Sequence, residues 1–271
     1  MFVVITTEEE RRGPLARAKD RVTGGNLQSQ RKVFLKNYYY HLTVRGARVP
    51  WNRVARMVGR GAGRLVAPPE LEIPPVRGLG RYSPTLFEGR LTALAAAQAL
   101  GDAGPPGSGS RTVGLVDEDG LWSWCCRELA PLCGAVRVYT KRPERYEVLS
   151  RQLMEDWGAS VVLADTLREL ESCDFAVSPA PLGVVKLGLP VITVDHSAVQ
   201  GRPTINRLRL DLPRDLLAEV PAGVQPEAFL GAAYELGTQK FPLDFRVAEC
   251  RVDGRRAGVG EVLLLGRRSP R

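Results

Sequence analysis

The sequence is poor in the residues that bind structural metals and form disulfide frameworks. It has two histidines and five cysteines in 271 residues, and no Cys-x-x-Cys pair. A structural zinc site needs Cys or His ligands at short spacings, and neither His41 nor His196 has a partner of that kind. The odd cysteine count argues against a disulfide framework. We therefore expect buried, reduced thiols and no metal site.

Long apolar runs are also lacking. The least polar stretch, residues 91–100, is about half as long as a helix that crosses a bilayer. Residues 1–10 have neither the basic start nor the long apolar core of a signal peptide. With 44% hydrophobic residues the chain has a globular composition. We expect a cytoplasmic protein with no membrane segment, folded as one large domain or two modest ones.

Positive charge is concentrated near the start of the chain. Residues 1–69 hold 14 Lys and Arg against four Asp and Glu, whereas the whole chain holds 38 and 30. Aromatic residues lie among these cations, at 38–40 and at Trp51. Such a mixture can bind nucleic acid or an acidic partner. It can equally be a solvated basic face, and no helix-turn-helix, RRM or zinc-finger signature favours nucleic acid.

The first part of the chain is irregular in pattern. We expect a buried strand at 2–5, basic helical stretches at 26–40 and 51–59, and a short strand at 65–67. A proline-rich connector follows at 68–84, then a helix at 84–100 with Leu86, Phe87, Leu91, Leu94 and Ala97 on one side. The Gly/Pro/Ser run at 101–110 is predicted to be a loop.

The second part alternates regularly between strands and helices. Apolar runs predict strands at 112–116, 136–139, 161–163, 175–178 and 191–194. Helical patterns separate the first three, and Gly134 and Gly158 end them. This order predicts a doubly wound, mostly parallel, Rossmann-like sheet. After it we expect helices at 213–219 and 226–236 and an antiparallel hairpin that pairs 245–252 with 261–265.

These patterns predict an α/β protein with four parts. They are a small basic α/β lobe (1–83), a connecting helix and linker (84–110), a Rossmann-like domain (111–203), and C-terminal helices with a hairpin (204–271).

Ligands of open parallel sheets bind beyond the carboxyl ends of the strands, near the point where strand order reverses. Four polar segments follow predicted strands: 117–120, 140–142, 178–181 and 195–197. The acids at 117–119 also resemble the Mg²⁺ pocket of receiver domains, but the fifth strand lacks the lysine that such a pocket needs. Helix capping by Asp119 is the simpler interpretation. Adjacent residues such as His196 and Ser197 cannot converge as a hydrolase triad.

Two segments carry a family resemblance. Val138–Arg145 and Asp174–Gly183 resemble the NADP-binding half of shikimate dehydrogenases and glutamyl-tRNA reductases, over about 50 residues in detail. The resemblance places Lys141 at the 2′-phosphate-binding arginine, with Arg142 beside it, and implies NADP as the cofactor. The other interpretation is that these cations only solvate the start of a helix.

The departures from that family are substantial. A dinucleotide loop has the pattern G-x-G-x-x-G, so that backbone amides meet the pyrophosphate. This chain has Asp117-Glu118-Asp119-Gly120-Leu121-Trp122 instead. Like charges about 4 Å apart repel by roughly 1–4 kcal/mol near a surface. The family's Asn-Val-Thr-x-Pro-x-Lys setting for its catalytic lysine is also missing from residues 1–100.

The leading hypothesis is therefore a Rossmann-like protein that binds a nucleotide or another small ligand between its lobes, with a degenerate dinucleotide loop. One alternative is an NADP-dependent oxidoreductase, and another is a non-catalytic module that binds nucleic acid or an acidic partner. The sequence identifies no catalytic residue, substrate or oligomeric state. The candidate binding residues are Asp117, Gly120, Thr140, Lys141, Arg142 and Ser178.

Overall fold

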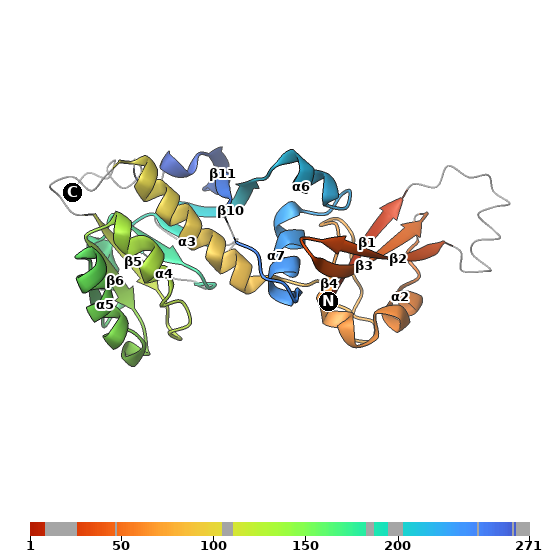
Figure 1. Cartoon of the computed structure of the whole chain (residues 1–271), viewed down its shortest axis with the longest axis horizontal. Helices are drawn as coiled ribbons and strands as arrows, with labels where there is room; N and C mark the ends of the chain where they lie inside the picture. Colours follow the sequence, from red (N-terminus) through yellow and green to blue (C-terminus); the bar gives the residue numbers. More distant parts are fainter. Residues whose placement is uncertain are drawn as a thin grey trace. The chain divides into compact units, whose positions relative to one another are not determined.

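The chain forms two units in a computed structural model, and each unit contains its own β-sheet (Figure 1). Unit 1 comprises Met1–Pro84 and Leu212–Asp244, and unit 2 comprises Thr85–Asp211 and Phe245–Arg271. The structure describes residues 1–8, 26–46, 48–104, 111–182, 187–194, 203–242, 244–261 and 263.

Unit 1 has a four-stranded sheet with the order β2-β3-β1-β4. Strand β1 is parallel to β3 and β4, and β2 is antiparallel to β3. The elements are β1 (Phe2–Glu8), β2 (Leu27–Phe34), β3 (Asn37–Arg45), α2 (Trp51–Val58), η1 (Gly59–Arg64), β4 (Leu65–Val66), α6 (Arg214–Glu219) and α7 (Pro226–Leu236).

Both faces of β1 are buried, which explains its continuous apolar sequence. Side chains alternate across a strand, so Val3 and Ile5 share one face and Phe2 lies on the other. On the first face Val3 and Ile5 join a core that includes Val54 of α2. On the second face the ring of Phe2 stacks on Tyr39 of β3, with centroids 5.3 Å apart, and meets the edge of Phe229 of α7. The sheet is thus packed between helical segments.

The helix predicted at 26–40 is wrong, because these residues form β2 and the start of β3. Burial alternates along β3, where Tyr39 is buried and Tyr38 and Tyr40 are exposed. Strand β2 is buried only at its ends and lies at the edge of the sheet. Its sequence therefore carries little period-2 signal, and its pairing with β3 fixes its conformation.

Unit 2 has an eight-stranded sheet with the order β12-β11-β10-β9-β8-β5-β6-β7. Its elements are α3 (Thr85–Asp102), β5 (Thr112–Val116), α4 (Cys125–Leu129), η2 (Ala130–Leu132), β6 (Ala135–Tyr139), η3 (Pro143–Arg145), α5 (Glu147–Trp157), β7 (Ser160–Ala164), η4 (Leu167–Ser172), β8 (Phe175–Ser178), β9 (Val191–Thr193), β10 (Thr204–Asp211), β11 (Arg246–Val252), β12 (Arg255–Ala257) and η5 (Val259–Glu261).

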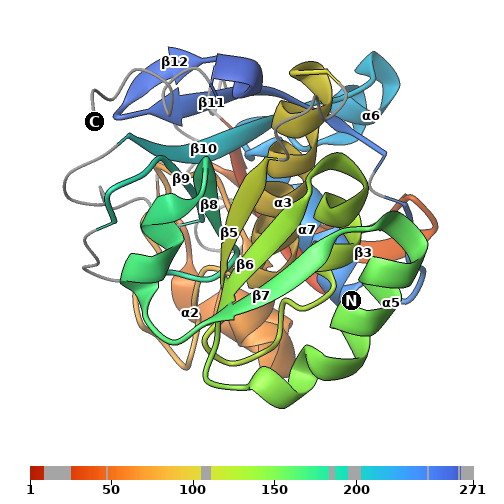
Figure 2. The ribbon, with the colours of Figure 1, turned by 90° about the vertical axis from the view of Figure 1, so that its left-hand side faces the viewer.

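Six neighbouring strands of this sheet are parallel to one another: β7, β6, β5, β8, β9 and β10. Figure 2 shows them following one another across the sheet in this order. Numbered along the chain, their spatial order β7-β6-β5-β8-β9-β10 is 3-2-1-4-5-6. This is the Rossmann order, in which the direction of winding reverses between the first and fourth strands. The expected Rossmann-like α/β fold is confirmed, and the reversal lies between β5 and β8.

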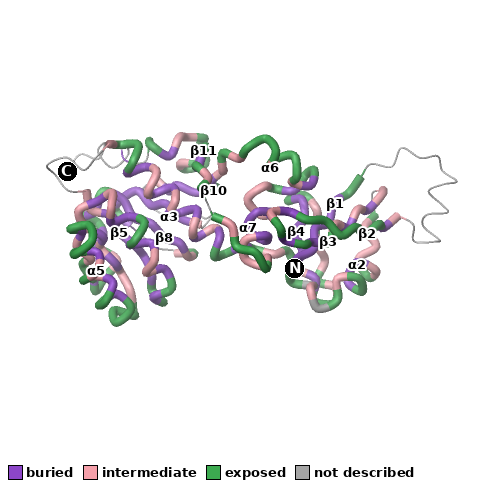
Figure 3. The backbone as a smooth tube through the Cα atoms, in the orientation of Figure 1, coloured by how far each residue is buried: buried purple, intermediate pink, exposed green. Residues whose placement is uncertain are grey.

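Both faces of this sheet are covered. Gly114 and Val116 of β5 face η4, since Leu170 packs beside Val116 and lies 3.5 Å from a Cβ built on Gly114. Helix α3 packs against β8, β9 and β11 and against α4. Strands β5 and β8 are accordingly buried along most of their length (Figure 3). Leu86, which we expected on the buried side of α3, is 56% exposed.

The predicted C-terminal hairpin exists, but its second strand is Arg255–Ala257 and not 261–265. Asp253 and Gly254 both have positive φ, at 48° and 83°, and directly join Val252 to Arg255. Positive φ at both turn positions is typical of a two-residue hairpin loop, so β12 begins at once. In the described part of the chain no helix combines the length and apolar character needed to cross a membrane.

Candidate ligand site at the carboxyl ends of β5 and β8

A cavity of about 240 Å³ opens where the strand order of unit 2 reverses. Its walls come from the segments that directly follow β5 and β8, the position at which Rossmann-like sheets bind ligands. Carboxylate and apolar side chains share the lining. The residues are Val116, Asp117, Glu118, Asp119, Trp122, Ser178, Ala180, Pro181 and Leu182.

Asp117 is the most constrained polar residue of this cavity. It is 1% exposed, and its carboxylate accepts hydrogen bonds from the backbone amides of Leu121 and Trp122 at 2.9 and 2.8 Å. The hydroxyl of Tyr146 donates a third hydrogen bond at 2.5 Å. Amides at the turn after the first strand bind the pyrophosphate in dinucleotide-binding Rossmann proteins. In this chain the Asp117 carboxylate occupies two of them.

Tyr146 is buried together with its acceptor. Burial, and then the hydrogen bond to Asp117, raise the pKa of the Tyr146 phenol well above its usual value. The phenol therefore remains a hydrogen-bond donor at any physiological pH. Because Tyr146 lies at the N-terminal end of α5, it ties that helix to the loop after β5.

Gly120 shapes the same loop. Its φ of 69° is in the left-handed region, and its amide donates to the Asp117 carbonyl at 3.2 Å. A Cβ built on Gly120 would lie 2.8 Å from Cγ of Arg145 and 2.9 Å from Cβ of Arg142. A side chain at this position would therefore meet both backbone strain and the loop after β6.

Trp122 fills the space between this loop and α3. Trp122 is 6% exposed, and its ring packs directly on Gly89, where an added Cβ would lie 2.2 Å from the ring. The same Cβ would lie 2.8 Å from the carbonyl oxygen of Pro179, after β8. Trp122 also packs against Trp124, with ring centroids 5.8 Å apart. A bulky ring thus lies beside the turn after β5, which in dinucleotide-binding Rossmann proteins is rich in glycine.

The cations that follow β6 lie on a neighbouring turn. Lys141 forms an ion pair with Glu118, and its backbone amide donates to the Glu118 carbonyl at 2.9 Å. The hydrogen bond with Glu118 is the main cause of the raised pKa of Lys141. The hydroxyl of Thr140 accepts a 3.0 Å hydrogen bond from the Arg142 amide, which fixes the turn. The charge of Lys141 is therefore partly neutralised by a carboxylate of the cavity wall.

Ser178 ends β8 and is buried. Its hydroxyl donates to the carbonyl of Ala180 at 2.7 Å, which holds the turn that forms the far wall of the cavity. Within the described residues, the cavity therefore has one wall of carboxylates after β5 and one wall of small and apolar side chains after β8.

Of the predicted binding residues, Asp117 and Ser178 line the cavity. Gly120 shapes its loop, and the other three form the adjacent turn: Thr140, Lys141 and Arg142. The contributions of Tyr146 and Gly89 were missed, because only the fold brings them to Asp117 and Trp122. Residues 195–197 and Gly183, which the sequence also suggested, lie outside the described part of the chain.

The nearby cysteines are poor nucleophiles. Cys125 and Cys126 are buried, and burial is the main cause of their raised thiol pKa values. Among the described residues no group of three His, Cys, Asp or Glu side chains is placed to hold a metal ion. The chemistry that the cavity offers is hydrogen bonding and negative charge.

The basic and aromatic residues of unit 1 are divided between its surface and its core. Tyr38 is exposed, and the guanidinium of Arg31 lies 3.9 Å from the centre of its ring. Tyr39 is 2% exposed and belongs to the core. Only part of the aromatic cluster is therefore available to an external partner.

No protein-family model matches the sequence, and no curated protein matches it. Solved structures similar to this chain include dehydrogenases. L-tryptophan dehydrogenase from Nostoc punctiforme is 15% identical, with 87% of this chain and 74% of that chain covered and a TM-score of 0.35. Shikimate 5-dehydrogenase from Listeria monocytogenes, in complex with shikimate and NAD, is 11% identical, with 90% of this chain and 93% of that chain covered and a TM-score of 0.34. Quinate dehydrogenase from Corynebacterium glutamicum, in complex with NAD, is 11% identical, with 86% of this chain and 91% of that chain covered and a TM-score of 0.31.

The strand order and the position of the cavity define the fold class of unit 2. Unit 2 is a Rossmann-like domain of the kind found in NAD(P)-binding proteins, with a cavity at the reversal point of its sheet. Its first loop departs from the dinucleotide-binding pattern, because a carboxylate of the chain occupies the loop amides.

Proposed function

We propose that this chain binds a small molecule in the cavity at the carboxyl ends of β5 and β8, and that it does so without a pyrophosphate on the loop amides. The observation that carries the proposal is the bonding of Asp117 to the amides of Leu121 and Trp122 beside that cavity. A diphosphate would have to displace a buried carboxylate that holds three hydrogen bonds. Such charge-assisted bonds contribute about 1.5–3 kcal/mol each.

The lining determines which end of a ligand enters. Glu118 and Asp119 are exposed carboxylates on the cavity wall, and Glu118 is paired with Lys141. The carboxylate of Asp119 favours a cation or a group rich in hydrogen-bond donors, and it repels phosphate. A nucleotide would therefore enter through its base or sugar and leave its phosphates in solvent.

Isothermal titration calorimetry on the full chain tests this function. The probes are adenosine, S-adenosylmethionine, ATP, NAD and NADP, each with and without Mg²⁺. Binding of adenosine or S-adenosylmethionine, with no tighter binding of NADP, supports the proposal. If none of these probes binds, the proposal is wrong. If NADP binds far more tightly than adenosine, the site recognises phosphate groups.

A matched pair of variants locates the site. Asp119→Asn removes a carboxylate from the cavity wall, and Asp156→Asn makes the same change on the exposed surface of α5. The first variant should weaken the binding of a cationic ligand by about 1 kcal/mol, roughly fivefold in affinity. The effect is modest because the wall is open to solvent. The second should leave affinity unchanged.

An NADP-dependent oxidoreductase is the second candidate. It is favoured by the cationic turn after β6, the second strand of the Rossmann order, where Lys141 and Arg142 follow Thr140. A residue that binds the 2′-phosphate of NADP lies after this strand. A substrate-dependent change of the nicotinamide absorbance, reduced by Lys141→Gln, would favour this candidate over simple binding.

A further inference from the structure

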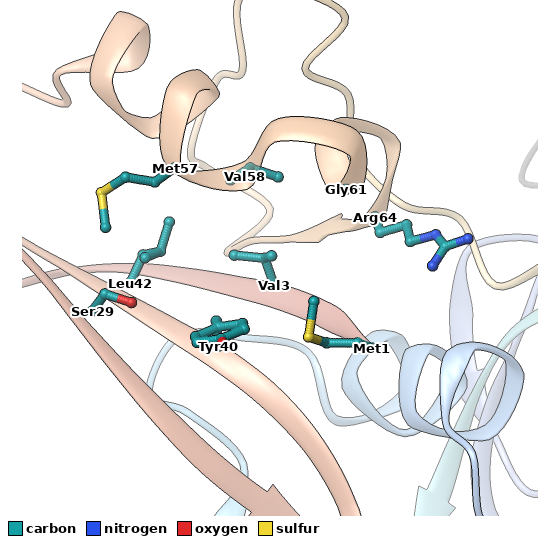
Figure 4. A pocket seen from close by; sticks show the side chains of 9 residues that line it. All are labelled: Met1, Val3, Ser29, Tyr40, Leu42, Met57, Val58, Gly61 and Arg64. Atoms are coloured by element: carbon teal, nitrogen blue, oxygen red, sulfur yellow. The ribbon is translucent and has the colours of Figure 1, made fainter.

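A second and larger cavity lies within unit 1, far along the chain from the residues of the proposed site. It has a volume of about 500 Å³ and opens between the sheet and the segment formed by α2 and η1 (Figure 4). One wall comes from the strands and the residue before β1, and the other comes from the helical segment. The lining residues are Met1, Val3, Ser29, Tyr40, Leu42, Met57, Val58, Gly61 and Arg64.

Most of this lining is apolar. Val3 and Leu42 are buried and form the floor of the cavity from the sheet side. Met1, Tyr40 and Met57 line it while remaining 58%, 37% and 46% exposed. Large apolar side chains that are exposed to solvent around a cavity are typical of binding surfaces. Methionine adapts its shape readily to different apolar ligands.

Arg64 supplies a cationic side chain at the edge of this apolar lining. Arg64, the last residue of η1, is exposed, and Figure 4 shows its side chain at one end of the cavity, extending away from Met57 and Leu42. None of the described residues that line the cavity is acidic, and among the described residues Arg64 has no hydrogen bond or ion pair to a carboxylate. Ser29 and Tyr40 supply hydroxyl groups on the opposite wall.

We propose that this cavity binds an amphipathic carboxylate, with an apolar chain or ring among the methionines and Leu42 and with its carboxylate paired to Arg64. A guanidinium matches a carboxylate in a two-point hydrogen-bonded pair. The volume lies within the range of about 300–1,000 Å³ that small-molecule sites occupy. All the lining residues belong to unit 1, so the site is independent of the cavity at β5 and β8.

The charge requirement is tested with decanoate and decanol, which differ at the polar end. Calorimetry on the full chain, below the concentration at which decanoate aggregates, should show decanoate binding at least tenfold more tightly than decanol. Arg64→Gln should remove about tenfold of the decanoate affinity and leave decanol unaffected. Arg56→Gln, on the exposed side of α2, should change neither.

The location is tested by filling the cavity. Gly61 lines it, and a Cβ there would meet only Cγ1 of Val58 at 3.5 Å, an ordinary contact. Gly63 belongs to the same η1 segment, and a Cβ there would meet nothing within 4 Å. Gly61→Leu should abolish decanoate binding, and Gly63→Leu should preserve it. Absence of decanoate binding to the unmodified chain, equal affinity for decanol, or indifference to both Arg64→Gln and Gly61→Leu would each overturn the proposal.

Discussion

The hydroxyl of Tyr146 donates a hydrogen bond of 2.5 Å to the carboxylate of Asp117, and both residues are buried. This contact links the loop after β5 to the beginning of α5. The same carboxylate accepts two backbone amides, so the loop is closed by a group from within the chain. In a dinucleotide-binding protein of this fold a phosphate would provide the negative charge at that turn.

The link between these residues predicts energetic coupling. Tyr146→Phe should lower the free energy of unfolding by about 1.5–3 kcal/mol, and Asp117→Asn by about 2–4 kcal/mol, since each leaves buried hydrogen-bonding groups without a partner. The double variant should lose at least about 1 kcal/mol less than the sum of the single losses. Urea unfolding followed by circular dichroism measures all four chains. Additivity within about 0.3 kcal/mol would contradict the coupling.

The raised pKa of Tyr146 predicts a loss of stability at alkaline pH. A tyrosine ionises near pH 10 in the unfolded chain. The folded state keeps its proton to higher pH, so its contribution to stability is complete below about pH 10 and declines as the pH rises above that value. Beyond that point the slope should be steeper than in Tyr146→Phe by up to about 1.4 kcal/mol per pH unit.

Unfolding free energies measured at intervals from pH 8 to 11 test this. The buried thiols have raised pKa values in both chains, so the difference between the two curves reports mainly on Tyr146. Parallel curves above pH 10 would show that the phenol ionises as freely in the folded state as in the unfolded one.

The packing of Trp122 on α3 predicts opposite effects for two glycines of that helix. A Cβ on Gly89 would overlap the Trp122 ring, so Gly89→Ala should destabilise the protein by about 1–3 kcal/mol. Gly101 lies in the same helix with nothing within 4 Å of its virtual Cβ. Gly101→Ala should stabilise by about 0.5–1 kcal/mol, because alanine restricts the unfolded chain. Thermal unfolding distinguishes the two, and an increased melting temperature for Gly89→Ala would contradict the contact.

The sequence predicted five of the six parallel strands of unit 2, because each of these five is a short apolar run and glycines end the helices between the first three. Gly158, for example, has a φ of 65° at the end of α5 and lies two residues before the start of β7. Sequential strands of this kind pair with near neighbours under strong rules of handedness. Their order then indicates the reversal point and the polar segments beside it. The sequence did not predict β10, in which apolar and polar residues are mixed and which pairs with β9.

The remaining features depend on distant contacts. Strand β2 carries exposed polar residues between buried ends, and its conformation comes from pairing with β3. Asp117 was recognised as a polar residue at a strand end, but its partner Tyr146 lies 29 residues away on another element. Nothing local to Gly89 shows that an indole packs on it. The sequence therefore indicated the position of the site and not the closure of its loop.

The five cysteines are free and buried, and burial raises the pKa of each, to about 11 for Cys173 and Cys250 and to about 12 for Cys133. Thiolates are the reactive species, and the fold both excludes reagents and disfavours ionisation. Ellman's reagent at pH 8 should therefore label less than one thiol per folded chain within minutes, and five per chain in 6 M guanidinium chloride. The slow phase under native conditions should accelerate with urea as unit 2, which holds all five, opens. Rapid labelling of the folded chain would show that at least one thiol is accessible, and fewer than five thiols in denaturant without reductant would show that some are oxidised.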